Sequence, residues 1–359
     1  MTYDFLIIGG GIAGISAGAR LAPLGSSLVL EAEDHLAYHA SGRSAALYEA
    51  KYGLPPTIAL NEASYTHHAT AHGGVLSPRG FLMLAGPDDI AAFEHDCETM
   101  GLTEIPAEAA LAKVPILNLD HLSRAAYADG ASDIDTDKLV HDFARDIRQH
   151  GGRIDTGARV TDIQRTPQGW TVGDGDKTHR CKTLINAAGA WADQIARLAG
   201  IAPLGLTPLR RSVARMPAPG GHDVTGWPML FGPGETWYAK PDAGAWIVSP
   251  ADEDPAEPHD AWADDMVLAE GIARYQPFVT EDVTWITSSW AGLRTFTPDR
   301  CLALGPDKDD PSFIWVAGQG GYGMQTSPAA SQLVADLIAG RAPEIDAATV
   351  AALNPARFR

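Results

Sequence analysis

The sequence predicts an α/β protein in which a Rossmann-like dinucleotide-binding domain is interrupted twice by segments of an α+β substrate domain. Two observations predict this organisation. The chain opens with a strand, a glycine-rich turn and a helix, in the order that a dinucleotide-binding unit requires. Paired strand and helix patterns return at three later places, and the stretches between them alternate apolar and polar residues, which is typical of a mixed or antiparallel sheet.

The N-terminal unit is the most specific motif of the chain. A short apolar run predicts a buried strand, and Gly9-x-Gly11-x-x-Gly14 follows it. A helix and a second apolar strand come next, and Glu31 ends that strand. The glycines would permit a tight turn, close approach of a pyrophosphate and close helix packing. Glu31 would accept hydrogen bonds from a ribose, so the order predicts a dinucleotide site at the helix N-terminus.

Later segments complete the predicted nucleotide domain. We expect a helix over residues 135–148, a strand at 182–186, and a last strand and helix over 313–339. The last unit contains a second glycine motif (318–323), but no strand with a ribose-binding acid follows it. We therefore interpret it as the closing unit of the same domain. The predicted nucleotide domain is 1–75, 135–195 and 291–359, and the substrate domain is 76–134 and 196–290.

Composition narrows the class of protein. With 359 residues and an apolar fraction of 45%, the chain can form two domains with a sizeable core. A net charge of -18 argues against nucleic acid or anionic lipid as partners. No apolar run is long enough to span a membrane. Three scattered cysteines favour reduced thiols, so we expect a cytoplasmic protein.

The histidine pair His68 and His72 has the i, i+4 spacing of metal ligands on a helix. No further ligand cluster accompanies the pair, so we expect no metal and a solvated helix face.

Further motifs follow one another along nearly the whole chain. They are YHASGRSAALYEAKYG (38–53), LSPR (76–79), DIDTDKL (133–139), NAAGAWAD (186–193), PLRRS (208–212), WPML (227–230), WYAKPDAG (237–244), SPADEDPAEPHD (249–260), WAGLRTF (290–296) and GQGGYGMQTS (318–327). With these motifs the chain resembles the D-amino-acid oxidase (DAO) family of FAD-dependent oxidoreductases. Within that family it is most similar to D-arginine dehydrogenase.

The resemblance implies a Rossmann-like FAD-binding domain and non-covalent FAD. In related sarcosine oxidases a cysteine shortly before a Thr-Pro-Asp motif attaches the flavin, whereas Gly292 holds the matching position here. The cofactor-binding residues that the resemblance implies are Gly9, Gly11, Ile12, Ala13, Gly14, Glu31, Ala32, Ser41, Gly42, Arg43, Ser44, Ala45, Ala46, Val160, Ala187, Gly189, Gly320, Gly321, Tyr322, Gly323, Met324, Gln325 and Thr326.

The resemblance also implies a substrate site. Arg211 and Arg294 match the arginines that bind the substrate carboxylate, and Tyr52 and Tyr238 match tyrosines that hydrogen-bond the substrate. An arginine can grip a carboxylate with two hydrogen bonds, although a structural ion pair is the alternative for each of them. The implied pocket residues are Leu47, Glu49, Phe81, Met229, Gly292 and Gly321.

The resemblance therefore implies oxidation of an amino acid at its Cα–N bond. Phe81 stands where D-arginine dehydrogenase has a glutamate that pairs with a cationic side chain, so we expect a D-amino acid with a neutral or apolar side chain. A secondary amine such as sarcosine is one alternative. A D-arginine or D-lysine dehydrogenase that uses Glu49 is another, although a loop carboxylate is ordinarily solvated.

Two alternative functions come from other classes of protein. One is an NAD(P)-dependent dehydrogenase, and the other is a non-catalytic flavin-binding protein. The electron acceptor, dioxygen or a quinone, and the oligomeric state stay open.

Overall fold

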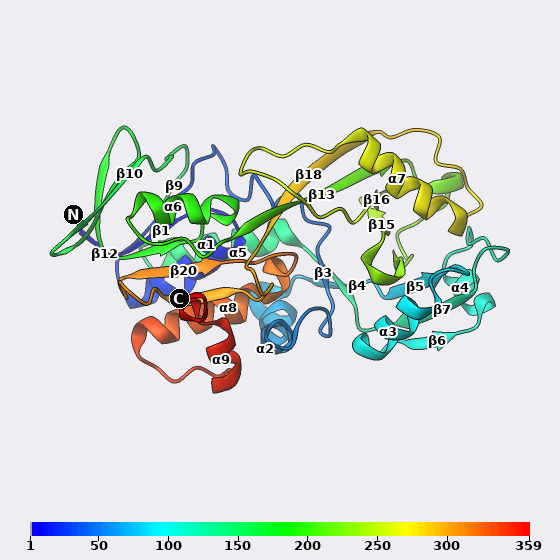
Figure 1. Cartoon of the computed structure of the whole chain (residues 1–359), viewed down its shortest axis with the longest axis horizontal. Coiled ribbons are helices and arrows are strands. Elements are labelled where there is room, and N and C mark those ends of the chain that lie inside the picture. Colours follow the sequence, from blue (N-terminus) through cyan, green and yellow to red (C-terminus); the bar gives the residue numbers. More distant parts are fainter. Residues whose placement is uncertain (1) are drawn as a thin grey trace.

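The structure is a computed structural model that describes residues 2–359. It confirms the predicted α/β class, with two large sheets at opposite ends of an elongated molecule (Figure 1). None of the helices in the described residues is long and apolar enough to cross a membrane. The helices are α1 (Ile12–Leu21), α2 (Pro55–Thr70), α3 (Ile90–Met100), α4 (Ala107–Lys113), α5 (Thr136–Gln149), α6 (Ala192–Leu198), α7 (Asp265–Tyr275), α8 (Gly323–Ala339) and α9 (Ala347–Leu353).

The first sheet is the Rossmann-like sheet. Its strands are β1 (Thr2–Ile8), β2 (Ser27–Leu30), β9 (Arg153–Asp155), β10 (Asp162–Thr166), β11 (Gly169–Gly173), β12 (Thr178–Asn186), β19 (Ala303–Pro306) and β20 (Phe313–Ala317). The central strand β1 runs parallel to both β2 and β12, and β12 runs parallel to β20. Strand β20, which precedes the second glycine motif, therefore belongs to the same sheet as β1.

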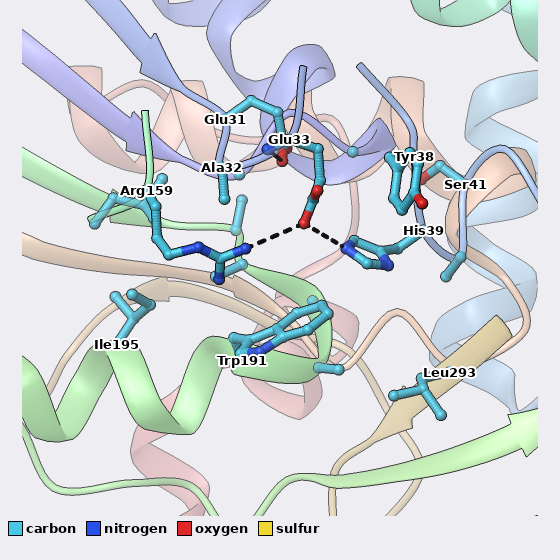
Figure 2. A pocket seen from close by; sticks show the side chains of 18 of the residues that line it. Glu31, Ala32, Glu33, Tyr38, His39, Ser41, Arg159, Trp191, Ile195 and Leu293 are labelled. Atoms are coloured by element: carbon cyan, nitrogen blue, oxygen red, sulfur yellow. Dashed lines mark hydrogen bonds and ion pairs between the residues drawn. The ribbon is translucent and has the colours of Figure 1, made fainter. Parts of the chain in front are cut away.

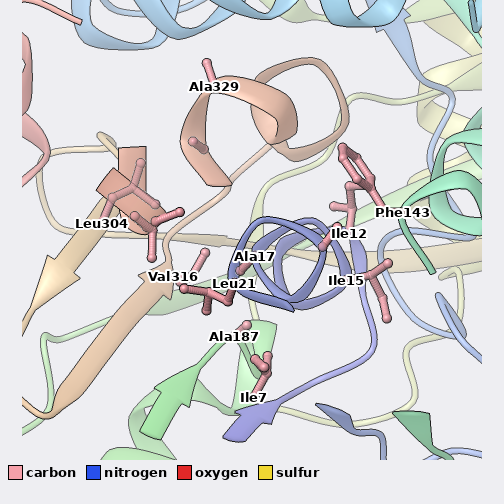
Figure 3. Close-up of a cluster of buried hydrophobic side chains, with 14 of the residues drawn as sticks. Ile7, Ile12, Ile15, Ala17, Leu21, Phe143, Ala187, Leu304, Val316 and Ala329 are labelled. Carbon is pink, nitrogen blue, oxygen red and sulfur yellow. The ribbon is translucent and has the colours of Figure 1, made fainter. Parts of the chain in front are cut away.

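Helix α1 lies at the centre of the largest core cluster (Figure 3). Its side chains Ile12, Ile15 and Leu21 are buried, and it packs against α5 and α8 as well as the sheet. The small residues between them allow this close packing. A Cβ at Gly18, for instance, would lie 2.9 Å from the Ile147 side chain of α5. The packing fixes the N-terminus of α1 at the carboxyl edge of the sheet.

The second sheet has nine strands and forms the other end of the molecule (Figure 1). They are β5 (Phe81–Ala85), β6 (Thr103–Ile105), β7 (Arg124–Ala128), β13 (Thr207–Met216), β14 (Met229–Phe231), β15 (Tyr238–Asp242), β16 (Ala245–Ser249), β17 (Asp254–Pro255) and β18 (Ser288–Phe296). The sheet is mostly antiparallel, with one parallel pair, β14 and β5. Strand β18 pairs with β13 along its whole length, so the boundary expected between residues 290 and 291 falls inside a strand.

A third, small sheet joins the two ends. It consists of β3 (Leu47–Tyr48), β8 (Ser132–Ile134) and β4 (Leu76–Pro78), with β8 in the middle. On β8, Asp133 accepts hydrogen bonds from Arg79 at 2.5 and 2.7 Å and from Lys240 of β15 at 2.5 Å. All three side chains are largely buried. Asp133 thus ties the small sheet to the second sheet.

Two local expectations change. The last long helix starts at Gly323 rather than near Ser327. Gly323, which was expected in the loop, is its first residue, and Pro328 lies within its second turn. His68 is fully buried, whereas a solvated face was expected. Its Nε2 lies 2.9 Å from the carbonyl oxygen of Gln325, so α2 packs on α8 through this side.

The Asp133 cluster generates a stability prediction. Removing the shared carboxylate by Asp133→Ala leaves two largely buried cations without their partner, so the free energy of unfolding should fall by about 3 kcal/mol. Urea unfolding of the holoprotein measures this loss. Asp88→Ala is the matched control, since Asp88 is exposed, and it should change the free energy by less than about 0.5 kcal/mol. An unchanged urea midpoint for Asp133→Ala would contradict the structural role of the cluster.

Candidate active site

The glycine motif forms a tight cradle between β1 and α1. Gly9 has a φ of +112°, in the region that favours glycine. A Cβ at Gly14 would lie 1.9 Å from the carbonyl oxygen of Gly9, so only glycine fits there. Gly11 is the N-cap of α1, and the Ile12 N–H donates to the Ser41 hydroxyl at 3.0 Å. The next N–H groups of the first helical turn have no partner within the helix. Such an N-terminus attracts a pyrophosphate.

Glu31 directly follows β2 and is 8% exposed. Its Oε2 accepts a hydrogen bond from the Gly10 N–H at 2.5 Å, and its Oε1 accepts one from the Glu33 N–H at 2.8 Å. Two backbone donors therefore hold the carboxylate at the mouth of the cradle. Each of its oxygens keeps a lone pair for a further donor, as a ribose hydroxyl would supply.

A cavity of about 390 Å³ begins at Glu31 and reaches Gly292 of β18. Figure 2 shows its walls, with Glu31 and Glu33 on one side and Trp191 on the other. Glu33 lies 3.3 Å from an Arg159 nitrogen and 3.1 Å from His39 Nε2, so a chain of polar contacts borders the cavity. The lining of the cavity is mostly apolar, with a few polar side chains such as Glu31, Glu33 and Ser41, which suits an adenine dinucleotide.

Two smaller cavities continue from the first. One of about 120 Å³ shares Gly292 and Ser41 with it and extends to the N-terminus of α8. The other, of about 60 Å³, lies beyond that and shares Arg211, Arg294 and Gly321 with the middle cavity. We call them the first, middle and inner cavities. Their arrangement in series provides room for a dinucleotide in the first, its reactive ring in the middle and a small substrate in the inner one.

The register of β13 and β18 places both predicted arginines on one face of the sheet. Arg211 lies opposite Gly292, and Arg294 is two residues further along β18. Side chains in this diagonal relation lie on the same face, about 7–8 Å apart. Both line the inner cavity. Two positive charges therefore meet at one wall of a small cavity, which is an anion site.

The two guanidinium groups differ in their partners. Arg211 donates to the carbonyl oxygen of Asp252 at 2.9 Å and to Glu253 at 3.1 Å, and it is 5% exposed. Burial, together with the neighbouring charge of Arg294, lowers its pKa. Arg294 has no hydrogen-bond or ion-pair partner among residues 2–359. Arg211 is thus held by the protein, while the donors of Arg294 stay open to a ligand.

An apolar wall faces the arginines. Strands alternate their side chains between two faces, so Phe81 and Met229, which are paired across β5 and β14, share a face with Phe231 and Tyr238. The Phe81 and Phe231 rings lie 5.1 Å apart. All four side chains line the inner cavity. The opposite face of the same strands is packed into the core of the second sheet.

Tyr52 is on the loop between β3 and α2, and it also lines the inner cavity. Burial, and next the charge of Glu235, raise the pKa of its phenol well above the usual value, so the hydroxyl is a donor at neutral pH. Its ring lies 5.2 Å from the Tyr322 ring. Tyr322 lines an outer hollow together with Glu235, Glu253 and Arg300. Arg211 lines both this hollow and the inner cavity.

Glu49 is the one carboxylate among the residues that line the inner cavity, and it is 9% exposed rather than solvated as expected. Its backbone N–H donates to Gln325 Oε1 at 3.1 Å, which fixes the loop to α8. Its carboxylate accepts one hydrogen bond, from the Lys51 N–H at 3.2 Å. Burial raises the pKa of Glu49.

Most predicted cofactor residues line the first or the middle cavity. They are Gly9, Gly11, Ile12, Ala13, Glu31, Ala32, Ser41, Arg43, Ser44, Val160, Ala187, Gly189, Gly320, Gly321, Gly323 and Met324. Ala45, Ala46 and Gln325 line the inner cavity. The others, Gly14, Gly42, Tyr322 and Thr326, line none of the three. Gly42 closes a turn onto Ala37, and the Thr326 hydroxyl donates to the Tyr322 carbonyl within α8, so these act on backbone shape.

Two predicted residues have other contacts than expected. Arg43 was expected to bind the cofactor, but its guanidinium donates to the carbonyl oxygens of Tyr38, Ala261 and Ala291 and to Asp260. Through these hydrogen bonds, Arg43 connects the loop after β2 with β18. Gly292 was expected in the substrate pocket, but it lines the first and middle cavities, because its α-carbon faces Ala40 of the cofactor loop.

The predicted substrate residues Leu47, Glu49, Phe81, Met229 and Gly321 meet Arg211, Arg294, Tyr52 and Tyr238 around the inner cavity. Sequence reasoning missed Met100 and Phe231 there and His39, Arg159 and Trp191 in the first cavity. Trp191 and His39 both lie inside motifs that the sequence analysis names. For Trp191, the signal that could have identified it is an aromatic residue shortly after the end of β12. Among residues 2–359 no three His, Cys, Asp or Glu side chains gather as metal ligands.

Comparisons with known proteins agree with this geometry. The chain is 23% identical to the glycine oxidase of Geobacillus kaustophilus (strain HTA426), over 96% of the chain and 95% of the relative. It is also 23% identical to the bovine (Bos taurus) FAD-dependent oxidoreductase domain-containing protein 1, over 93% of the chain and 81% of that relative.

Solved structures share the fold. The structure of L-proline dehydrogenase from P. horikoshii superposes with a TM-score of 0.85 at 21% identity, covering 99% of this chain and 98% of that one. The structure of the Geobacillus glycine oxidase gives a TM-score of 0.84 at 22% identity, covering 97% and 98%. Residues 4–337 match the family DAO, described as FAD dependent oxidoreductase. The cradle, Glu31 and the cavities in series fit FAD, and the protein belongs to the DAO family of FAD-dependent oxidoreductases.

Proposed function

We propose that the protein oxidises a D-amino acid with a neutral or apolar side chain at its Cα–N bond. The observation that carries this proposal is the open guanidinium of Arg294 beside Arg211 on the wall of the inner cavity. FAD, when bound, supplies the hydride acceptor, and the resulting imino acid hydrolyses in water to a 2-oxo acid and ammonia.

The residues of the inner cavity bind and orient the substrate. Arg294 would take the carboxylate with two hydrogen bonds, and Arg211 would add its charge from the same face. The hydroxyls of Tyr52 and Tyr238 would donate to the same group. Fixing the carboxylate in this way sets the position of Cα against the middle cavity, and such orientation supplies much of the rate enhancement.

The preference for a neutral side chain rests on the apolar wall of Phe81, Met229 and Phe231. Burying a cationic side chain against these residues without an ionised partner is costly. The D configuration rests on the sequence motifs that resemble D-arginine dehydrogenase. A cytoplasmic location, with dioxygen or a quinone as electron acceptor, completes the proposal.

Specific observations favour three alternative kinds of substrate. The burial of Glu49 beside the cavity favours a cationic side chain, as in D-arginine or D-lysine. The similarity to the structure of an L-proline dehydrogenase favours a secondary amine or a substrate of the other configuration. A non-catalytic flavin-binding role would leave the open arginine without a purpose.

Non-covalent attachment of the flavin gives the first test of this proposal. Gly292 has no side chain that could form a thioether, and none of the three free cysteines lines the first, middle or inner cavity. Acid precipitation of the purified protein should therefore leave FAD in the supernatant. Yellow colour that stays with the pellet would contradict this expectation.

Arg294→Met should weaken substrate binding and leave FAD bound. Loss of a charged hydrogen-bonding partner in such a site costs about 2–5 kcal/mol, so KM should rise by about thirtyfold or more. Arg294→Lys should recover part of the loss, because it keeps the charge without the planar fork. Arg215→Met, on the same strand as Arg211 but paired with Asp242 away from the cavities, is the matched control. If the KM of Arg294→Met equals that of the wild type, Arg294 does not bind the substrate and has a structural role.

The apolar wall predicts an order of substrates. The ratio kcat/KM should be higher for D-methionine and D-phenylalanine than for D-arginine, and sarcosine should fall below the preferred D-amino acid. A cation–π contact with Phe81 would recover only about 1–2 kcal/mol of the cost of burying a guanidinium. Steady-state assays with the four compounds measure the order. A clear preference for D-arginine would refute the role given to Phe81.

A further inference from the structure

The inner cavity brings together one group that can accept a proton and four that cannot at neutral pH. The ionisable residues that line it are Glu49, Tyr52, Tyr238, Arg211 and Arg294. Arginine stays protonated, and a phenol ordinarily loses its proton only near pH 10. The Glu49 carboxylate is the remaining base. An amino acid reaches the cavity as an ammonium ion. Its Cα hydrogen can leave as hydride only after the nitrogen has lost a proton and its lone pair is free.

We infer that Glu49 binds the ammonium group of the substrate and accepts its proton before the oxidation. This inference rests on the proposed function and adds a residue with a defined role to it. The N–H bond breaks, its proton goes to a Glu49 carboxylate oxygen, and the electron pair stays on nitrogen. That pair then forms the C=N bond as the Cα hydrogen leaves with two electrons to FAD, so charge and electrons balance.

The carboxylate has no cation of its own. Among residues 2–359 no Lys, Arg or His side chain pairs with Glu49, and the amine of Lys51 pairs with Glu62 at 2.8 Å instead. A carboxylate that is nine-tenths buried without a cation is costly. A substrate that brings an ammonium group would remove this cost. The two arginines bind the opposite charge of the same zwitterion and come from β13 and β18, whereas Glu49 follows β3.

The surroundings of Glu49 favour a raised proton affinity. Burial raises its pKa against the opposing effect of the Lys51 backbone and charge. Tyr48, on the preceding strand, has a pKa raised to about 12, first by burial and next by the charge of Glu49, so it stays protonated. From α2, His68 is neutral because burial lowers its pKa, and Glu62 is engaged by Lys51. From α8, Gln325 contributes an uncharged amide. Among residues 2–359, Lys51 is the cation whose charge acts on Glu49, and its effect opposes that of burial.

Equilibrium binding provides the first test, with a readout independent of activity. The ligand 2-aminoisobutyrate has a carboxylate and an ammonium group but no Cα–H, and isobutyrate has the carboxylate alone. Calorimetry on the holoenzyme should give about tenfold weaker binding of 2-aminoisobutyrate to Glu49→Gln and unchanged binding of isobutyrate. Equal weakening of both ligands would mean that Glu49 only shapes the loop, which would overturn the inference.

The pH profile of flavin reduction provides the second test. At neutral pH and without oxygen, D-methionine should reduce the flavin of Glu49→Gln about 100-fold more slowly than the flavin of the wild type. A loss of this size is within the range of general-base catalysis. The deficit should shrink about tenfold per pH unit towards alkaline pH, where the substrate loses its proton in solution. Glu49→Asp keeps a carboxylate and should retain the wild-type shape of the profile at a lower rate. Glu62→Gln, an exposed carboxylate nearby, is the matched control.

The outcomes separate the inference from the proposed function. Reduction of wild-type flavin by an amino acid establishes the function, whatever Glu49 does. A deficit of Glu49→Gln that is the same at every pH, or one confined to D-arginine and D-lysine, would overturn the inference, and the second result would assign Glu49 to side-chain recognition. Failure of every amino acid to reduce wild type would defeat the proposed function together with the inference.

Discussion

The antiparallel pairing of β13 with β18 is the constraint on which the site depends. The two strands run from the second sheet towards the nucleotide domain (Figure 1). Their register sets Gly292 opposite Arg211 and puts Arg294 on the same face. Gly292 lets the strand border the first and middle cavities, and the two arginines face the inner one. A slip of β18 by one residue would turn Arg294 to the opposite face of the sheet from Arg211. One strand pair thus connects the cofactor region with the substrate region.

The three charged side chains of the inner cavity differ in whether the protein itself supplies a partner of opposite charge. Glu253 of the outer hollow holds Arg211, whereas Arg294 and Glu49 lack partners of opposite charge in the described residues. An amino acid zwitterion carries one charge for each of these two groups. The apolar wall of the second sheet excludes water from the remaining side, which strengthens both interactions. Recognition, orientation and proton transfer would then depend on the same few contacts.

Sequence reasoning went furthest where local patterns decide the structure. The glycine motif, Glu31, the helix near residues 135–148 and the last strand and helix follow from spacing and periodicity, and the structure contains each of them. The tertiary partners of long side chains could not be read in this way. Arg43 binds backbone carbonyls more than 200 residues away along the chain, and His68 is buried against α8. Glu49 is in a loop whose burial depends on its hydrogen bond to Gln325, which no local pattern encodes.

The central claim is that an amino acid, held by its carboxylate at Arg294, reduces the flavin of this protein. Anaerobic mixing of the holoenzyme with the two enantiomers of one apolar amino acid, followed by the visible absorption of oxidised flavin, tests it most directly. Complete bleaching by the D-enantiomer and an unchanged spectrum with the L-enantiomer is the predicted result. Bleaching by the L-enantiomer alone would contradict the proposed configuration, and an unchanged spectrum with both enantiomers would contradict the claim itself.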